Sequence, residues 1–269
     1  MNKTIAFIGA GNMATAIVSG LIAENYPSEK MIVTARTAEK LKKLAMQYHV
    51  QTTLSNVDAV NKADVVVLAV KPAQMQSVMD EISHALKQKK PLIISVASGV
   101  TLKQYENWSD ASLSIIRAMP NTPASVGLAV TAFIGNKPVE KNDRVLAEQI
   151  FSAVGKVFWL AEEDQMNTVI ALSGSGPAYL FLWMEMMEES ARAMGLPAEI
   201  AHAMTQQLFL GASTLAMKSE KSFPELRRQV TSPGGTTEQA IHVFEKNNMR
   251  EILRAAMEAA AKHGREMAK

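Results

Sequence analysis

Residues 4–14 read Thr-Ile-Ala-Phe-Ile-Gly-Ala-Gly-Asn-Met-Ala, a short apolar run followed at once by two closely spaced glycines. The run predicts a strand over 4–8, and the pattern Gly9-x-Gly11-x-x-Ala14 predicts a tight turn into a helix over 12–24. Gly9 permits the turn, Gly11 lets the backbone approach a pyrophosphate with no Cβ in the way, and Ala14 keeps the helix close to the strand. Free N–H groups at the helix N-terminus favour a phosphate there. An ordinary strand-to-helix turn is the alternative interpretation.

The chain up to residue 161 alternates short apolar runs with helical patterns. The run over 65–70 has no polar alternation, which is typical of a strand covered on both faces. Strands that alternate with helices predict βαβ units and a parallel sheet, so we expect an α/β, Rossmann-like dinucleotide-binding domain over 1–161. The predicted strands are 4–8, 31–35, 65–70, 92–96, 113–118, 129–134 and 155–160, and the predicted helices between them include 12–24, 38–48 and 74–86.

From residue 162 onward the pattern is helical, and we expect a second, all-α domain over 162–269. Its predicted helices are 164–172, 178–194, 198–219 and 249–267. Ten of the 17 methionines lie in this half, where methionine at helical spacing is typical of core or interface packing. These helices carry more apolar surface than one small helical domain can bury, which predicts a homodimer.

Composition excludes several classes of protein. The 269 residues are 48% hydrophobic and 20% charged, so the chain can bury a sizeable core. A net charge of +2 is too balanced for a protein that binds nucleic acid through phosphate neutralisation. The absence of cysteine excludes disulfides, thiolate metal sites and a cysteine nucleophile. Glycine clusters interrupt the two long uncharged runs, 4–23 and 165–184, so we expect no membrane span and a cytoplasmic protein.

Unusual residues follow several of the predicted strands. Val70-Lys71-Pro72 follows one strand, Ala97-Ser98-Gly99 follows the next, and Met119-Pro-Asn-Thr-Pro123 follows another. Open α/β sheets bind ligands beyond the carboxyl ends of their strands, so these segments predict a site along that edge. Turn chemistry alone is enough to explain any single one of them.

The end of the second predicted strand bears on the choice of cofactor. An NAD site usually has a carboxylate there, whereas this chain has Ala35-Arg36-Thr37. An arginine can stack on adenine and pair with a 2′-phosphate, and no carboxylate is placed to repel that phosphate. The sequence therefore favours NADPH over NADH.

A second candidate site lies in the helical half, where Thr231-Ser-Pro-Gly-Gly-Thr-Thr237 precedes a helical stretch over 238–244. Hydroxyls, paired glycines and a helix N-terminus together can hold a small anion such as a carboxylate. A linker turn with a threonine cap is the alternative. The five histidines show no metal-ligand spacing, so we predict no metal site.

Taken together, five segments resemble the pyrroline-5-carboxylate reductase family, in order and spacing over nearly the whole chain. They are Ile8–Ala14, Ala69–Pro72, Arg117–Pro123, Ser173–Tyr179 and Ser232–Thr237. The resemblance implies reduction of L-1-pyrroline-5-carboxylate to L-proline, the last step of proline biosynthesis, by hydride from NADPH or NADH. It also implies that the helical domain serves dimerisation and substrate binding, and that dimers can form a higher assembly.

The resemblance implies a role for particular residues of this chain. Thr237 would lie close to the ring nitrogen as the catalytic residue. The implied substrate-binding residues are Glu220, Ser232, Gly234, Gly235, Thr236 and Thr237. The implied cofactor-binding residues are Gly9, Gly11, Asn12, Met13, Arg36, Thr37, Asn56, Ala69, Val70, Lys71, Pro72, Ser95 and Ala97.

Three other readings stay open on the sequence. A β-hydroxyacid dehydrogenase also pairs a Rossmann domain with helices, but it is expected to carry a catalytic lysine where residues 179–194 offer only Arg192. A reductase that uses a deazaflavin cofactor is a second alternative. A non-catalytic NADP(H) sensor is a third, although a sensor has no need of a second anion site.

Overall fold

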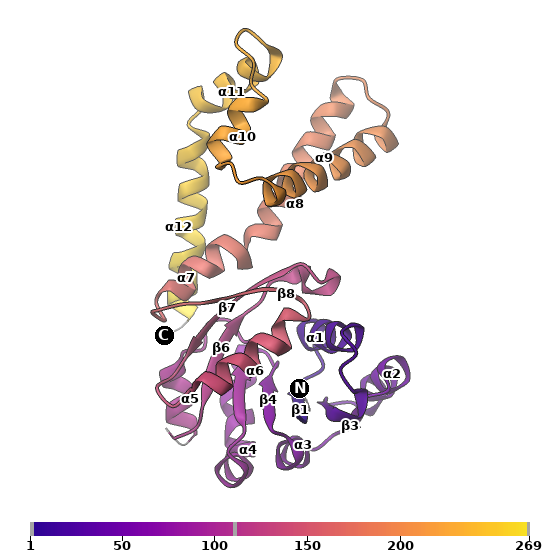
Figure 1. Ribbon diagram of the computed structural model, residues 1–269, viewed down its shortest axis with the longest axis vertical. Helices are drawn as coiled ribbons and strands as arrows, with labels where there is room; N and C mark the ends of the chain where they lie inside the picture. Colours follow the sequence, from indigo (N-terminus) through magenta and orange to yellow (C-terminus); the bar gives the residue numbers. More distant parts are fainter. Residues whose placement is uncertain (1–2, 110–111, 268–269) are drawn as a thin grey trace. The chain divides into compact units, whose positions relative to one another are not determined.

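The computed structural model describes residues 3–109 and 112–267 (Figure 1). It divides into two compact units. Unit 1 holds the described residues up to Gly174 together with those from Ala260 onward, and unit 2 holds Ser175–Ala259. Residues 162–174 and the end of the last helix pack with unit 1. The division into two compact units therefore does not test the predicted domain boundary at 161/162, which stays a prediction.

Unit 1 is built on one sheet, whose strands follow the order β3-β2-β1-β4-β5-β6-β7-β8. Every residue of β1, β2, β4 and β5 is buried, because these uncharged runs are covered on both faces. The strands are β1 Ile5–Ile8, β2 Met31–Thr34, β3 Gln51–Thr53, β4 Val65–Leu68, β5 Leu92–Ser95, β6 Ile115–Met119, β7 Ala129–Gly135 and β8 Gly155–Trp159.

The predicted Rossmann-like architecture is confirmed, with two differences. The predicted parallel sheet contains one antiparallel pair, β6 and β7. Only nine residues, 120–128, join these strands, too few for the crossover that parallel neighbours require. Strand β3 was not predicted, because its polar residues Gln51, Thr52 and Thr53 at the sheet edge lack an apolar pattern.

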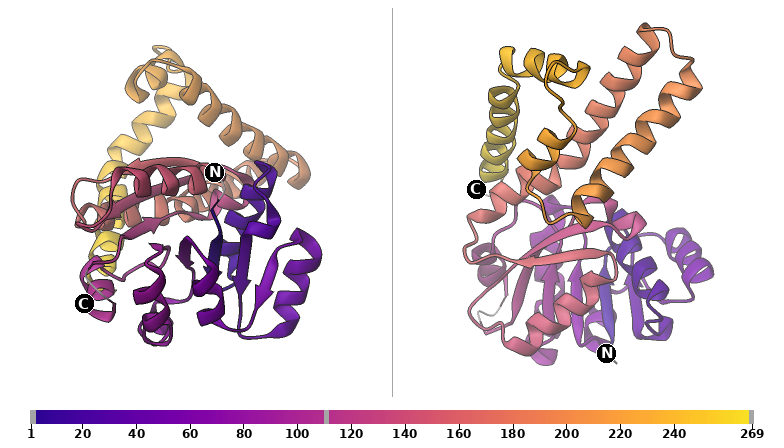
Figure 2. Two further views of the ribbon diagram at one scale, coloured as in Figure 1. Left: turned by 60° about the horizontal axis from the view of Figure 1, so that its bottom comes forward. Right: turned by 45° about the horizontal axis from the view of Figure 1, so that its top comes forward.

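Helices cover both faces of this sheet and bury a core on each (Figures 1 and 2). Buried side chains of α1 and α6 pack on one face, and those of α3, α4 and α5 pack on the other. The helices of this unit are α1 Asn12–Ala23, α2 Ala38–Tyr48, α3 Asn56–Lys62, α4 Met75–Lys89, α5 Leu102–Trp108, α6 Lys141–Ser152 and α7 Gln165–Val169. Helix α7 continues into a π-helical segment, Ile170–Gly174.

The described residues of unit 2 contain helices and no strand, as predicted. Helices α8 and α9 pack side by side as a hairpin (Figure 2). The helices are α8 Gly176–Ala193, α9 Ala198–Lys218, α10 Phe223–Gln229, α11 Thr236–Lys246 and α12 Met249–Met267, whose end belongs to unit 1. Helix α10 was not predicted, although its capping box from Ser222 to Glu225 is a recognisable start signal. None of the helices in the described ranges has the length and hydropathy that a membrane crossing requires.

Helix α1 packs closely against the turn between α6 and β8, which leads to a test of stability. A Cβ added at Gly20 would lie 2.5 Å from Val154 Cγ1 and 2.6 Å from the carbonyl oxygen of Ala153. We therefore expect Gly20→Ala to lower the free energy of unfolding by about 1–3 kcal/mol, even though alanine is the better helix former.

Urea denaturation measures this change. The matched control is Ser19→Ala, since Ser19 is exposed on the same helix. A Gly20→Ala variant as stable as the control would contradict the close contact.

Candidate functional site

The turn between β1 and α1 lies directly against the end of β4. Gly9 has a φ of +102°, and a Cβ there would lie 2.8 Å from the carbonyl oxygen of Ala69. Only glycine combines that conformation with that lack of space. Helix α1 then begins with no side-chain cap and no acidic residue in its first turn, so its N-terminal N–H groups are left for a ligand.

A groove of about 650 Å³ opens at this turn. It runs past the carboxyl ends of β1, β2 and β4, where an open α/β sheet binds its ligand. The residues that line it are Gly9, Ala10, Gly11, Thr34, Ala35, Arg36, Thr37, Lys40, Leu54, Asn56, Ala69, Val70, Lys71, Ala73, Gln74, Ser77, Val78 and Glu81.

A chain of hydrogen bonds fixes the wall of the groove. The Thr34 hydroxyl accepts from the backbone N–H of Gly9 at 3.2 Å and donates to Asn56 Oδ1 at 2.7 Å. The amide nitrogen of Asn56 in turn donates to Glu81 Oε2 at 2.9 Å. The glycine turn, the end of β2 and the start of α3 are therefore held together by side chains of the protein itself.

The charges along the groove favour an anion. Arg36, Lys40 and Lys71 line it, against the single carboxylate of Glu81, which is already engaged by Asn56. Lys40 was not among the predicted site residues. Its position was readable, because it is the third residue of α2, a helix whose N-cap Thr37 makes no side-chain cap hydrogen bond.

The groove brings together eight of the predicted cofactor-binding residues, from four separate stretches of sequence. These are Gly9, Gly11, Arg36, Thr37, Asn56, Ala69, Val70 and Lys71. Five others do not line it: Asn12, Met13, Pro72, Ser95 and Ala97. Asn12 and Met13 begin α1, whereas Ser95 and Ala97 are buried at the end of β5. A role in cofactor binding stays a prediction for all thirteen.

The segment after β6 is held from two sides by Asn121. Its side-chain nitrogen donates to the Ser173 carbonyl oxygen at 3.0 Å, and its oxygen accepts from the Val130 N–H at 2.9 Å. Asn121 is only 8% exposed. Two of the segments singled out from the sequence, 119–123 and 173–179, are thus joined by one buried side chain.

The predicted anion-binding bend, Ser232–Thr237, lies in unit 2, in the loop after α10 and the first two residues of α11. The Gly235 N–H donates to the Ser232 carbonyl oxygen at 3.0 Å, and the Gly234 N–H donates to Glu238 Oε2 at 2.8 Å. The N–H groups of Thr236 and Thr237 donate to no atom of the described residues. Two adjacent amide donors at the positive end of an eleven-residue helix are thus free for an anion.

Glu220 lies in a different loop, the one between α9 and α10, and is exposed. No hydrogen bond within the described residues joins it to the bend. The substrate-binding role of Glu220 and of the six-residue bend, like the catalytic role of Thr237, stays a prediction.

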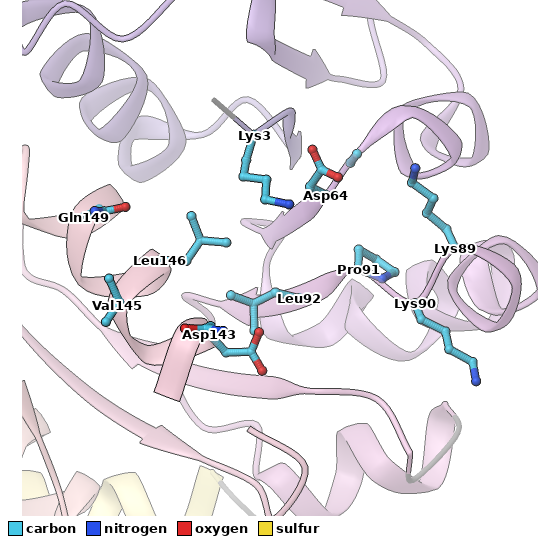
Figure 3. Close-up of a pocket in the computed structure, with 12 residues that line it drawn as sticks. Lys3, Asp64, Lys89, Lys90, Pro91, Leu92, Asp143, Val145, Leu146 and Gln149 are labelled. Atoms are coloured by element: carbon cyan, nitrogen blue, oxygen red, sulfur yellow. The ribbon is translucent and has the colours of Figure 1, made fainter. Parts of the chain in front are cut away.

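A second cavity, of about 480 Å³, lies at the opposite edge of the sheet (Figure 3). Lys3, Asp64 and Pro91, which precede β1, β4 and β5, lie in its wall. It contains none of the predicted site residues, and it lies at the amino ends of the parallel strands, away from the edge where such sheets bind ligands. Across residues 3–109 and 112–267, no cluster of three or more His, Asp or Glu side chains offers a metal site.

Two family models match the chain. A model of pyrroline-5-carboxylate reductase dimerisation matches residues 163–267. A model described as NADP oxidoreductase, coenzyme F420-dependent, matches residues 4–99. The first covers the helical half, and the second covers the strands and helices around the groove.

Known proteins resemble the chain over its whole length. A pyrroline-5-carboxylate reductase of Vibrio alginolyticus is 39% identical, and the match covers 100% of this chain and 98% of that one. The structure of a pyrroline-5-carboxylate reductase from Coxiella burnetii superimposes with a TM-score of 0.96 at 46% identity, covering 100% of both chains. A Plasmodium falciparum pyrroline carboxylate reductase, solved with NADP bound, gives 0.89 at 27% identity, covering 100% of this chain and 99% of that one. The chain therefore belongs to the pyrroline-5-carboxylate reductase family.

Proposed function

We propose that this protein reduces L-1-pyrroline-5-carboxylate to L-proline with NADPH, the last step of proline biosynthesis. The observation that carries the proposal is the groove at Gly9, where the backbone closes on β4 with no room for a side chain. Similarity to reductases of this name over the full chain supports the substrate.

The residues of the groove suit a phosphorylated dinucleotide. Gly9 and Gly11 allow a pyrophosphate to approach the backbone, and Asn12 and Met13 carry N–H groups at the start of α1. At the other end, Arg36 and Lys40 supply positive charge, with Thr37 beside them. A 2′-phosphate gains from both cations, which favours NADPH over NADH. The Plasmodium relative was solved with NADP bound, which agrees with this choice.

The bend of unit 2 suits the carboxylate of the substrate. The free N–H groups of Thr236 and Thr237 would receive the carboxylate, while Ser232, Gly234 and Gly235 shape the turn. We assign to the Thr237 hydroxyl a hydrogen bond with the ring nitrogen, and we place Glu220 at the edge of this site.

The chemistry asks little of the protein beyond orientation. When bound, the reduced nicotinamide supplies a hydride to the imine carbon, and a proton on the ring nitrogen makes that carbon more electrophilic. The chain holds the carboxylate and the nitrogen in place, and such positioning removes several kcal/mol from the barrier. No strong general base is needed, which agrees with a bend whose functional groups are amides and hydroxyls.

The helical unit supports a homodimer. Helices α8, α10 and α11 contain no buried residue. Large apolar side chains are more than half exposed on α8 and α9, among them Leu180, Phe181, Leu208 and Leu210. A monomer rarely leaves so much apolar surface in water, and a dimerisation model matches this region. A higher assembly of dimers and a cytoplasmic location stay predictions.

The activity itself is the first test. We expect the purified protein to oxidise NADPH when L-1-pyrroline-5-carboxylate is added, measured by the loss of absorbance of the reduced nicotinamide. NADH in place of NADPH provides the comparison and should be used less efficiently. Binding of NADPH without oxidation would favour the sensor, and activity on a β-hydroxyacid instead would favour the dehydrogenase.

The second test concerns the choice of cofactor. Arg36→Asp should raise the KM for NADPH roughly ten- to a hundredfold, because a charge-assisted contact with the 2′-phosphate becomes a repulsion. The KM for NADH should change little. Lys42→Asp is the matched control, since Lys42 is exposed on α2, the helix that follows Arg36, and does not line the groove. Equal effects on both cofactors would refute this role for Arg36.

The third test concerns the substrate site. Thr237→Ala should lower kcat by about ten- to a hundredfold, on the order of 1.4–2.7 kcal/mol of transition-state stabilisation. Steady-state kinetics with saturating NADPH measure the loss. Thr214→Ala is the control, because the Thr214 hydroxyl donates only to the Leu210 carbonyl oxygen within α9. Unchanged turnover in Thr237→Ala would show that the hydroxyl is dispensable.

A further inference from the structure

A buried polar cluster lies behind the end of β5, outside the groove. Ser95 of β5 and Arg117 of β6 are neighbours across the two parallel strands, so both side chains lie on the same face of the sheet. Tyr105 of α5 covers them on that face. Ser95 and Tyr105 are fully buried, and Arg117 is 4% exposed.

Hydrogen bonds tie this cluster to the backbone at the sheet edge. The Ser95 and Tyr105 hydroxyl oxygens are 2.5 Å apart. Ser95 Oγ also accepts from the Ala97 N–H at 3.2 Å, and the Val96 N–H donates to the Leu68 carbonyl oxygen at 3.1 Å. The conformation of residues 96–97 is therefore set by the Ser95 side chain and by the end of β4. The end of β4 leads directly into groove residues Ala69 and Val70.

The position of Tyr105 is itself fixed by charge. Glu163 Oε1 accepts a hydrogen bond from Arg117 Nη1 at 2.9 Å. The same oxygen accepts from the N–H of Leu102, the first residue of α5, at 2.9 Å. One carboxylate oxygen thus anchors both the start of α5 and the buried cation beside its tyrosine. The Tyr105 phenol is protonated at neutral pH, because burial raises a pKa that is already 10.0 in an ordinary tyrosine.

We propose that Tyr105 is a positioning residue for the nicotinamide end of the cofactor, acting through Ser95 on the backbone of Val96 and Ala97. The proposal rests on the proposed function, because it takes the edge beyond β4 and β5 as the place of the nicotinamide. Tyr105 is too deeply buried to touch the cofactor itself. Its hydroxyl holds Ser95 in the orientation in which Oγ accepts the Ala97 N–H.

The test separates the two ends of the cofactor. Calorimetric titration compares NADPH with 2′,5′-ADP, which carries the adenine and the 2′-phosphate but no nicotinamide. We expect Tyr105→Phe to lower the affinity for NADPH about three- to tenfold, the range for one lost hydrogen bond. The affinity for 2′,5′-ADP should stay within about twofold of the wild-type value. Phenylalanine keeps the ring, which packs edge-on against Trp108.

Tyr26→Phe is the matched control. Tyr26 is also buried, and its hydroxyl donates to the Lys3 carbonyl oxygen near the opposite edge of the sheet. Tyr26→Phe should therefore leave the affinities for NADPH and for 2′,5′-ADP unchanged. A general loss of stability would weaken NADPH and 2′,5′-ADP alike, which contradicts the proposal.

A double-mutant cycle tests whether Tyr105 acts through Ser95. Ser95→Ala should also weaken NADPH selectively, and the double variant should bind NADPH no more weakly than Ser95→Ala alone. Additive losses would overturn the route through Ser95, and Tyr105→Phe with wild-type affinity would overturn the proposal. Wild-type protein that binds neither NADPH nor 2′,5′-ADP would instead overturn the proposed function.

Discussion

The lack of space at Gly9 is the constraint on which the groove beside β4 depends. A side chain there would collide with the carbonyl of Ala69, the first residue after β4, and the backbone would have to leave a conformation that glycine alone adopts easily. Because the turn lies so close to β4, helix α1 begins at the edge of the sheet with its N-terminal amides uncovered. The Thr34–Asn56–Glu81 chain of hydrogen bonds then holds the neighbouring segments around that turn.

Both candidate binding regions offer free backbone N–H groups at a helix N-terminus, but they suit ligands of different size. The groove offers backbone amides and cations to a large, highly charged ligand, whereas the bend offers two adjacent amides and three hydroxyls to a small one. Neither region contains a buried carboxylate or histidine suited to strong acid–base work. That combination fits a hydride transfer, in which orientation carries most of the catalysis. It argues against a non-catalytic sensor, because a sensor has no use for the second region.

Much of this architecture could be predicted because it depends on patterns among residues that are close in sequence. The uncharged run at Val65–Leu68 predicts a strand covered on both faces, and the Gly9–Ala14 spacing predicts the turn. Strand β7 was predicted over 129–134, but its antiparallel direction was missed, although the short connection after the predicted strand 113–118 argues against a parallel crossover. Lys40 was missed although its place in the first turn of α2 was readable, whereas the Ser95–Tyr105–Arg117 cluster escaped because its members are brought together only by folding. The sequence predicted the segments that line the groove, but not the hydrogen bonds that hold them together.

The central claim is that the nicotinamide and the bend meet around one small substrate. A crystal structure of the protein with NADP⁺ and L-proline tests it most directly. We predict the proline carboxylate on the N–H groups of Thr236 and Thr237, with the ring carbon about 3–3.5 Å from C4 of a nicotinamide in the same or the neighbouring subunit. Proline bound elsewhere, or a bend far from every nicotinamide in the assembly, would contradict the account.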